Sequence, residues 1–327
     1  MSNEMPLVWG CKEDTPDPRD YKYTEVMGAA PADMPSREVG FDAEEKYGKL
    51  RNDHQGYSSG CVSFGSTNDV EMTILKALKK AVNLSQRFIY SQIALSGGGA
   101  SPRDAYKLMN KIGVCEEQYM PVSYGWTLTE AKMKDSTGLG EGTKNASAWR
   151  IGAYRAIDSL DMDVLAQAIF ENGGCGGGFR PVSGQMGHFI FLKGYGMHNG
   201  CKGLKYKDSY DPFEKWIIKT DKFYLDHISS DKEVQLFSIW TAEAGNWEKV
   251  MNKLVRKKNE KEVFLQIGNK RYWVKDEKAF SELSAGGLIG SWSDIEEVEN
   301  FTTSYEGDII GSPNLADVLK NIFGIRK

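Results

Sequence analysis

The 327-residue sequence predicts an α+β fold rather than a doubly wound sheet. Helical patterns fill the first half, apolar strand patterns follow in the second, and the two kinds do not alternate. With 40% hydrophobic and 26% charged residues, the chain is able to form one large core or two cores. A net charge of -4 lacks the basic surplus typical of nucleic-acid-binding proteins, and no segment approaches the ~20 apolar residues of a membrane helix.

Three helices are predicted in the first half of the chain. Apolar residues recur at helical spacing over residues 61–82. The segment "LSQRFIYSQIAL" is typical of a second helix, with Ser85 as its N-cap. In "SPRDAYKLMNKIG", Ser101 occupies the N-cap position, Pro102 the first helical position, and Gly113 ends the helix.

Strands are predicted in the second half. The short apolar run "GHFIFLKGYG" is bounded by glycines and predicts a buried strand, and "LKYKDSYD", "EKWIIKTDKFYL" and "VQLFSIWTA" continue the pattern. The glycine-rich "NGGCGGGFR" around Cys175 predicts a flexible loop, which either lines a binding cleft or is a plain turn.

The pattern divides the chain into three parts. Residues 1–50 are rich in Pro, Asp and Gly and predict an extended arm that packs on the domain formed by residues 51–244. Residues 245–327 predict a small additional α/β domain with a docking or binding role. It begins with a charged helix or linker, "NWEKVMNKLVRKKNEKE", followed by a hairpin, "VFLQIGNKRYWV".

The cysteines indicate a reducing compartment. There are five, an odd number, and no two form a CxxC pair, so neither a cysteine-based zinc site nor any other metal is expected. The N-terminal residues lack the apolar segment of a secretory signal, which leads us to expect a cytoplasmic or virion-associated protein without disulfides. The five are Cys11, Cys61, Cys115, Cys175 and Cys201.

Cys61 is the candidate nucleophile. It starts the first predicted helix, and the partial positive charge of a helix N-terminus favours a thiolate. The preceding small residues Ser58, Ser59 and Gly60 leave room for a substrate backbone. Gln55 is an uncharged donor a few residues upstream, so its amide and the backbone N–H of Cys61 are candidates for an oxyanion hole.

A thiol nucleophile needs a base, and His188 is the best candidate among four histidines. It opens the apolar strand "HFIFLKGYG", whereas His54 and His198 are expected in a surface loop and a turn, and His227 has no special context. A structural histidine remains the simpler alternative for His188. In "KDSYDP", Asp208 follows a strand and is able to orient a histidine ring, with Asp211 as its rival.

These segments together resemble the papain-like cysteine peptidases. "QGYSSGCVSF" is similar to the nucleophile motif of that family, and "GHFIFLKGYG" is similar to its histidine strand. "KDSYDP" resembles its Asn-Ser-Trp segment with Asp in place of Asn, and "GVCEEQYMP" resembles the segment between the two lobes. "PDPRDYKY" resembles a lead-in of bacterial and phage members. The likeness spans roughly residues 9–240.

The resemblance implies a two-lobed fold, with a helical lobe carrying Cys61 and a β-barrel-like lobe carrying His188. It implies that Cys61 attacks a peptide carbonyl, His188 transfers the proton, Asp208 orients His188, and Gln55 helps hold the oxyanion. No cofactor is implied, and the partner is a peptide or protein substrate rather than nucleic acid or membrane. The implied substrate-binding residues are Ser59, Gly60, Gly97, Gly98 and Gly187, of which Gly97 and Gly98 belong to "SGGG".

The sequence also departs from that family. Val62 follows the nucleophile where an aromatic residue is usual, Ser58 stands where a cysteine is usual, and Tyr210 replaces the Trp that shields the orienting pair. Two alternatives to a peptidase therefore stay open. One is a catalytically silent or single-turnover structural or binding protein, for example a phage particle component that docks through residues 245–327. The other is a cell-wall peptide amidase or related thiol acyl-transfer enzyme.

Overall fold

The structure is a computed structural model of residues 1–327, and it divides into two compact units, Met1–Gly245 and Asn246–Lys327. The structure describes residues 9–182, 187–210, 213, 215–226, 232–245, 247, 252–257, 262–267, 270–274, 296–298 and 304–309.

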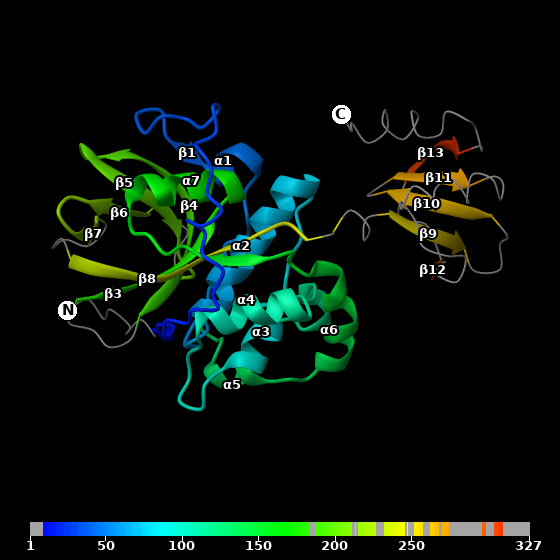
Figure 1. Ribbon diagram of the computed structural model, residues 1–327. Helices are drawn as coiled ribbons and strands as arrows, with labels where there is room; N and C mark the ends of the chain where they lie inside the picture. The colour runs from blue at the N-terminus through cyan, green and yellow to red at the C-terminus, as the bar shows by residue number, and fades with distance from the viewer. Residues whose placement is uncertain are drawn as a thin grey trace. The chain divides into compact units, whose positions relative to one another are not determined.

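In the first unit, α3–α6 group on one side of the long helix α2 in Figure 1, and the sheet lies on the other side together with α1 and α7, which contact its strands. The helices are α1 (Ala43–Tyr47), α2 (Cys61–Leu78), α3 (Gln86–Ile93), α4 (Pro102–Lys111), α5 (Glu130–Lys134), α6 (Leu139–Ala146) and α7 (Met162–Asn172), with 3-10 turns η1 (Glu117–Tyr119) and η2 (Ser147–Trp149). Helix α2 is buried along most of its length, because it packs on both sides.

The sheet of the first unit closes on itself. Its strands are β1 (Phe41–Asp42), β2 (Tyr154–Ala156), β3 (Cys175–Pro181), β4 (His188–His198), β5 (Cys201–Lys207), β6 (Lys215–Lys219), β7 (Phe223–Leu225) and β8 (Lys232–Ala242). The path β4-β3-β8-β7-β6-β5 returns to β4 through antiparallel pairing of β5 with β4. This ring of antiparallel pairings fits the β-barrel-like lobe that the resemblance implies.

The predicted α+β character and the helix starts are confirmed. Helix α2 begins at Cys61 and ends at Leu78, where Lys79 adopts a left-handed conformation. The Ser85 hydroxyl caps α3 by accepting from the backbone N–H of Phe88 at 3.1 Å.

The cap of α4 differs from the prediction. Pro102 occupies its first turn, but Ser101 makes no side-chain cap, because its hydroxyl donates to the carboxylate of Asp14. The Asp14 carboxylate accepts from the backbone N–H of Arg103 at 3.2 Å instead. A residue of the N-terminal arm therefore caps a helix of the central domain.

The prediction of a flexible loop at "NGGCGGGFR" is wrong. Cys175 begins strand β3, which lies between β4 and β8, and its side chain is fully buried in the core rather than at a cleft. A Cβ on Gly176 would lie 2.4 Å from the Tyr106 hydroxyl oxygen, and one on Gly178 would lie 2.6 Å from the Phe237 ring. The glycines mark close packing of large rings on this strand, not flexibility.

The second unit contains a five-stranded sheet in the order β12-β9-β10-β11-β13. Its strands are β9 (Asn252–Lys257), β10 (Val263–Ile267), β11 (Lys270–Val274), β12 (Glu296–Val298) and β13 (Ser304–Ile309). Antiparallel pairing of β10 with β11, ending at Ile267 opposite Lys270, confirms the predicted hairpin strands, and their turn residues lie outside the described residues. The expected helix or linker around residues 252–257 is wrong, because strand pairing on both sides of β9 overrides its charged composition.

Within the described part of the chain, no helix combines the length and the apolar character needed to cross a membrane.

Replacing Gly176 by Ala tests the close packing of β3. The added methyl group meets the Tyr106 hydroxyl and the Phe189 ring, at 2.4 and 2.6 Å, so we expect the free energy of unfolding to fall by about 1–3 kcal/mol. The control is Gly140→Ala, because a Cβ at this exposed helical position meets nothing within 4 Å and favours the helix. Denaturant unfolding in which Gly176→Ala is as stable as Gly140→Ala would contradict this packing.

Candidate active site

A buried histidine and a buried aspartate form the centre of the candidate site. His188 is the first residue of β4, where pairing with Phe179 of β3 fixes its backbone. Its Nε2 lies 2.9 Å from Oδ1 of Asp208, and the two side chains are 2% and 7% exposed. The structure therefore brings together the residues predicted as base and orienter.

Asp208 is held by three donors. Besides the ring of His188, the backbone N–H of Tyr210 donates to Oδ1 at 3.1 Å, and the Lys215 ammonium group donates to Oδ2 at 2.7 Å. Burial by itself raises the pKa of Asp208, but the charges and hydrogen bonds of His188 and Lys215 outweigh burial and hold that pKa well below its usual range. The carboxylate is thus ionised and fixed in orientation.

Cys61 is the predicted nucleophile. It is the first residue of α2 and is fully buried. Burial lowers the pKa of His188, but the Asp208 carboxylate and, after it, the Cys61 thiol raise that pKa to about 9. Among the described residues, Nδ1 of His188 has no partner at full hydrogen-bond geometry although it is buried. The arrangement leaves Nδ1 as the ring nitrogen available for proton exchange with sulfur.

Aromatic side chains enclose the His188 ring. Trp9 and Tyr210 lie near it with ring centroids at 6.4 and 5.6 Å, and Phe179 meets it edge-on at 5.7 Å. Tyr210 thus lies where the sequence analysis placed a substitute for the family's tryptophan. Trp126, which the sequence did not single out, stacks on Tyr210 at 6.1 Å. The enclosure keeps water from the His188–Asp208 pair.

Gln55 connects the nucleophile loop to the segment after Asp208. Its backbone N–H donates to the carbonyl of Ser209 at 2.9 Å, and its side-chain oxygen accepts from the Ser209 hydroxyl. Its Nε2 donates to the carbonyl of Ser58 at 2.7 Å, and the side chain is fully buried. These contacts hold Gln55 in the loop that leads to Cys61.

Only some of the predicted substrate-binding residues lie close to one another in the structure. A Cβ on Gly98 would lie 3.1 Å from the Ser59 hydroxyl, so the glycine-rich turn faces the nucleophile loop, whereas nothing lies within 4 Å of one on Gly97. Gly60 is the N-cap residue of α2. Glu130, which the sequence analysis missed, accepts from the Ser59 backbone N–H at 2.8 Å. No sequence motif marks Glu130.

The N-terminal residues form a strap between the two lobes, defined here as residues 9–12. Cys11 exchanges two backbone hydrogen bonds with Gly187, at 2.9 and 3.1 Å, directly before His188. On its other side, the backbone N–H of Ala100 donates to Gly10 at 2.8 Å and that of Lys12 donates to Ala100 at 3.0 Å. The chain's own backbone thus pairs with a predicted substrate-binding residue, Gly187.

Two features hold the strap in place. Gly10 approaches the nucleophile loop so closely that a Cβ there would lie 2.0 Å from the Ser59 carbonyl oxygen. Asp14, just beyond the strap, accepts from the indole N–H of Trp240 at 2.8 Å, and its backbone N–H donates to the Ser238 hydroxyl at 2.9 Å. The start of the described chain lies between β3 and helices α3 and α4 in Figure 1.

His54 and His198 make contacts of their own. His54 is half-buried rather than on the surface: it contacts Trp126 and Tyr210 with centroids at 4.5 and 5.6 Å, and its Nδ1 accepts from the Gly56 N–H. His198 ends β4, stacks on Trp216 and pairs with Asp226. Asp211 and His227 lie outside the described residues.

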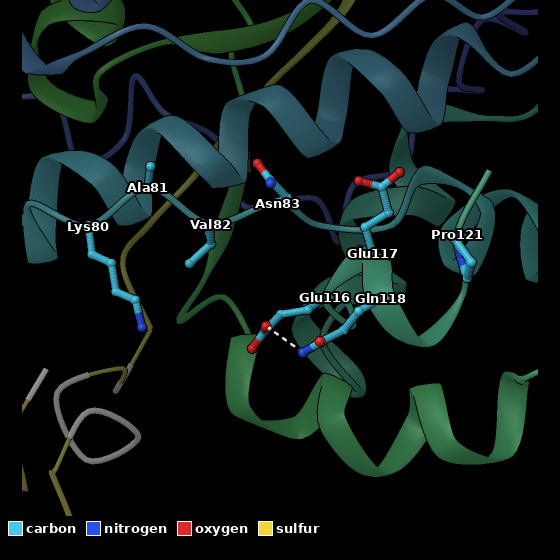
Figure 2. Close-up of a pocket in the computed structure, with 8 residues that line it drawn as sticks. All are labelled: Lys80, Ala81, Val82, Asn83, Glu116, Glu117, Gln118 and Pro121. Atoms are coloured by element: carbon cyan, nitrogen blue, oxygen red, sulfur yellow. Dashed lines mark hydrogen bonds between the residues drawn. The ribbon is translucent and has the colours of Figure 1, made fainter. Parts of the chain in front are cut away.

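A separate pocket of about 480 Å³ lies on the helical side (Figure 2). It is lined by Lys80, Ala81, Val82, Asn83, Glu116, Glu117, Gln118 and Pro121. Since α2 has 18 residues, this pocket lies roughly 27 Å along the helix from Cys61. No cysteine or histidine lines it, so it lacks the groups of a thiol site.

All five cysteines carry free thiols. Within the described residues, no group of three or more His, Cys, Asp or Glu side chains is arranged to hold a metal ion.

Comparison with solved structures identifies the fold. Xylellain, a cysteine protease from Xylella fastidiosa, matches with a TM-score of 0.54 over 73% of this chain and 97% of its own, at 18% identity. The chain has a papain-like fold. The procathepsin B S9 of Trypanosoma congolense matches with a TM-score of 0.52 over 73% of this chain and 87% of its own, at 11% identity. No family profile and no curated protein sequence matches the chain.

In this papain-like chain, the strap lies against the nucleophile loop, and Gly10→Ala tests whether it limits access to Cys61. The new Cβ collides with backbone, at 2.0 Å from the Ser59 carbonyl oxygen, so the strap has to move. Overpacking of this kind costs about 1–3 kcal/mol and destabilises the strap in its closed position. We therefore expect iodoacetamide to alkylate Cys61 roughly tenfold faster than in the wild type. The measurement is mass-spectrometric labelling of Cys61 over time.

The matched control is Gly28→Ala, since a Cβ on Gly28 meets nothing within 4 Å. It is expected to react at the wild-type rate. Equal labelling rates in the two variants would show that the strap does not limit access to Cys61.

Proposed function

We propose that this chain is a thiol peptidase that hydrolyses peptide bonds through Cys61, His188 and Asp208. The proposal rests on the buried imidazole of His188. Its Nε2 contacts the Asp208 carboxylate, and its Nδ1 has no other hydrogen-bond partner among the described residues, which leaves Nδ1 for Cys61. A cysteine nucleophile needs this sequence of thiol, base and orienting group. The papain-like fold supports the same reading.

The first step is attack by sulfur. A pKa of about 9 keeps His188 protonated at neutral pH, so an imidazolium next to Cys61 stabilises the thiolate. The thiolate adds to the scissile carbonyl carbon to give a tetrahedral oxyanion. When the oxyanion collapses, the C–N bond breaks and His188 gives its proton to the leaving amine.

Two donors serve the oxyanion. The backbone N–H of Cys61 is at the start of a helix, where the N–H groups have no acceptor within their own helix. The amide of Gln55 supplies the second donor from the same loop, and its contacts with Ser58 and Ser209 set its position before the charge develops.

Hydrolysis of the thioester completes the cycle. His188, now neutral, takes a proton from water, the hydroxide adds to the acyl carbon, and the C–S bond breaks to release the acid. Asp208 stays ionised throughout because Lys215 neutralises it and the His188 ring hydrogen-bonds it whether the ring is charged or neutral. Its role is to hold the ring orientation and stabilise the imidazolium, not to accept the proton.

The substrate is an extended peptide whose backbone takes the place of the strap. Residues 9–12 pair with Gly187 and Ala100 through main-chain hydrogen bonds, which is the way an added β-strand is recognised. Ser59 and Gly98 face each other beside this path. The expected docking role of residues 245–327 stays a prediction.

The strap also supports the second candidate, a protein that keeps the fold without turnover. Cys61 and His188 are 0% and 2% exposed while the strap is in place. A latent peptidase and a silent protein differ once the strap is displaced, because only the peptidase then cleaves peptides.

The proposal is tested with Cys61→Ala made in the Gly10→Ala background. We expect Gly10→Ala to cleave a fluorogenic peptide mixture and to form an adduct at Cys61 with a peptide-based epoxide. Adding Cys61→Ala removes the nucleophile, so cleavage falls by at least about 10³-fold and labelling is lost.

The matched control is Cys201→Ser in the same background. Cys201 begins β5, away from the His188–Asp208 pair, so both readouts are expected to stay unchanged. Unchanged peptide cleavage after Cys61→Ala would overturn the proposed nucleophile, and absence of cleavage in Gly10→Ala alone would favour the silent protein.

A further inference from the structure

A second buried thiol belongs to the strap, which runs between the nucleophile loop and Gly187. Cys11 is in the strap, is 1% exposed, and belongs to a segment 50 residues before Cys61, which is 0% exposed. Cys11 has no recognisable motif around it in the sequence, and its neighbours in space are distant along the chain. The three remaining cysteines lie in other parts of the molecule.

Backbone contacts fix Cys11 from two directions. On one side it pairs with Gly187, the residue before His188, through hydrogen bonds of 2.9 and 3.1 Å. On the other side the preceding residue, Gly10, lies against the carbonyl of Ser59, two residues before Cys61. Cys11 is therefore held between the histidine strand and the nucleophile loop.

The Cys11 side chain is buried next to this pairing. Its backbone N–H and carbonyl both face Gly187, and a strand side chain leaves perpendicular to such pairing. At 1% exposure it points inward rather than to solvent. Burial raises the pKa of the Cys11 thiol, and the charge of Cys61 is the next largest cause, which agrees with two neighbouring sulfurs.

We propose that Cys11 and Cys61 form a reversible disulfide on exposure to hydrogen peroxide, which locks the strap over the site. The proposal rests on the proposed function only in taking Cys61 as the reactive thiol. It adds a modification site to the chain and a redox control of the strap.

The chemistry balances with peroxide as the oxidant. The Cys61 thiolate attacks one peroxide oxygen, the O–O bond breaks, and hydroxide leaves, which oxidises Cys61 to a sulfenic acid. The Cys11 sulfur then attacks the Cys61 sulfur, the S–O bond breaks, and water leaves with the Cys11 proton. In total, two thiols and one hydrogen peroxide give one disulfide and two waters.

The two thiols have complementary roles in this scheme. Cys61 at the helix start, next to the His188 imidazolium, is the one that reacts with peroxide. Cys11 stays a thiol and resolves the sulfenic acid. Because peroxide is little larger than water, it suits a covered thiol better than a bulky disulfide oxidant does.

The experiment is peptide mapping of the full-length chain. The reduced protein is treated with hydrogen peroxide, remaining thiols are blocked with iodoacetamide, and the digest is analysed without reductant. We expect a linked pair of peptides containing Cys11 and Cys61, with a mass two hydrogen atoms below the sum of the two reduced peptides. The linked pair is expected to disappear after treatment with dithiothreitol. The readout needs no peptide cleavage, so it is separate from the test of the proposed function.

Two variants make the result specific. In Cys11→Ser, Cys61 has no resolving thiol, so we expect it to advance to the sulfinic acid, which dithiothreitol does not reverse. Cys201→Ser is expected to form the linked pair as the wild type does. Melting curves of both variants verify that they fold.

The proposal is overturned if the wild type accumulates Cys61 sulfinic acid without the linked pair. It is also overturned if reductant restores the free Cys61 thiol to the same extent in Cys11→Ser and the wild type.

Discussion

The buried contact between His188 and Asp208 is the interaction on which the site depends. A carboxylate at this depth is costly unless opposite charges and hydrogen-bond donors replace water. Here His188 and Lys215 supply the charges and the Tyr210 N–H a further donor. Breaking such a buried pair by removing one partner generally costs about 3–5 kcal/mol, so the residues around it are held tightly.

The closed ring of strands provides these partners in the required positions. His188 opens β4, Asp208 follows β5, and Lys215 opens β6, so neighbouring strands bring all three together. Ser209, the residue after Asp208, connects this pair to the helical side. Its backbone carbonyl and its hydroxyl both form hydrogen bonds with Gln55. The nucleophile loop is thereby tied to the same turn that carries the orienting carboxylate.

The strap is part of the packing that encloses His188. The same enclosure that excludes water from His188 includes Trp9 of the strap, and the strap's backbone pairs with Gly187. The described state is therefore one in which the proposed machinery is assembled but covered. For the proposed peptidase we infer that movement of residues 9–12, rather than rearrangement of Cys61, His188 or Asp208, opens the site.

The residues of the proposed site were easier to predict from the sequence than the residues around them. Gln55, Cys61, His188 and Asp208 were predictable because each belongs to a local motif with its own physical reason, such as a helix start or a strand edge. Lys215, Glu130 and Cys11 were not, because their importance comes from neighbours far away in the chain. The flexible loop predicted at Cys175 is wrong, because the local sequence does not distinguish a glycine that makes room for the rings of Tyr106 and Phe237 from a glycine that forms a turn.

The most direct test of this view is the protonation state of His188, followed by ¹⁵N NMR of the full-length chain with labelled histidines. His188→Gln assigns the signal among the four histidines. We expect both ring nitrogens to carry protons at pH 7 and to titrate near pH 9, with Asp208→Asn moving the midpoint to lower pH, because its charge raises the pKa of His188. A neutral imidazole at pH 7, unaffected by Asp208→Asn, would contradict it.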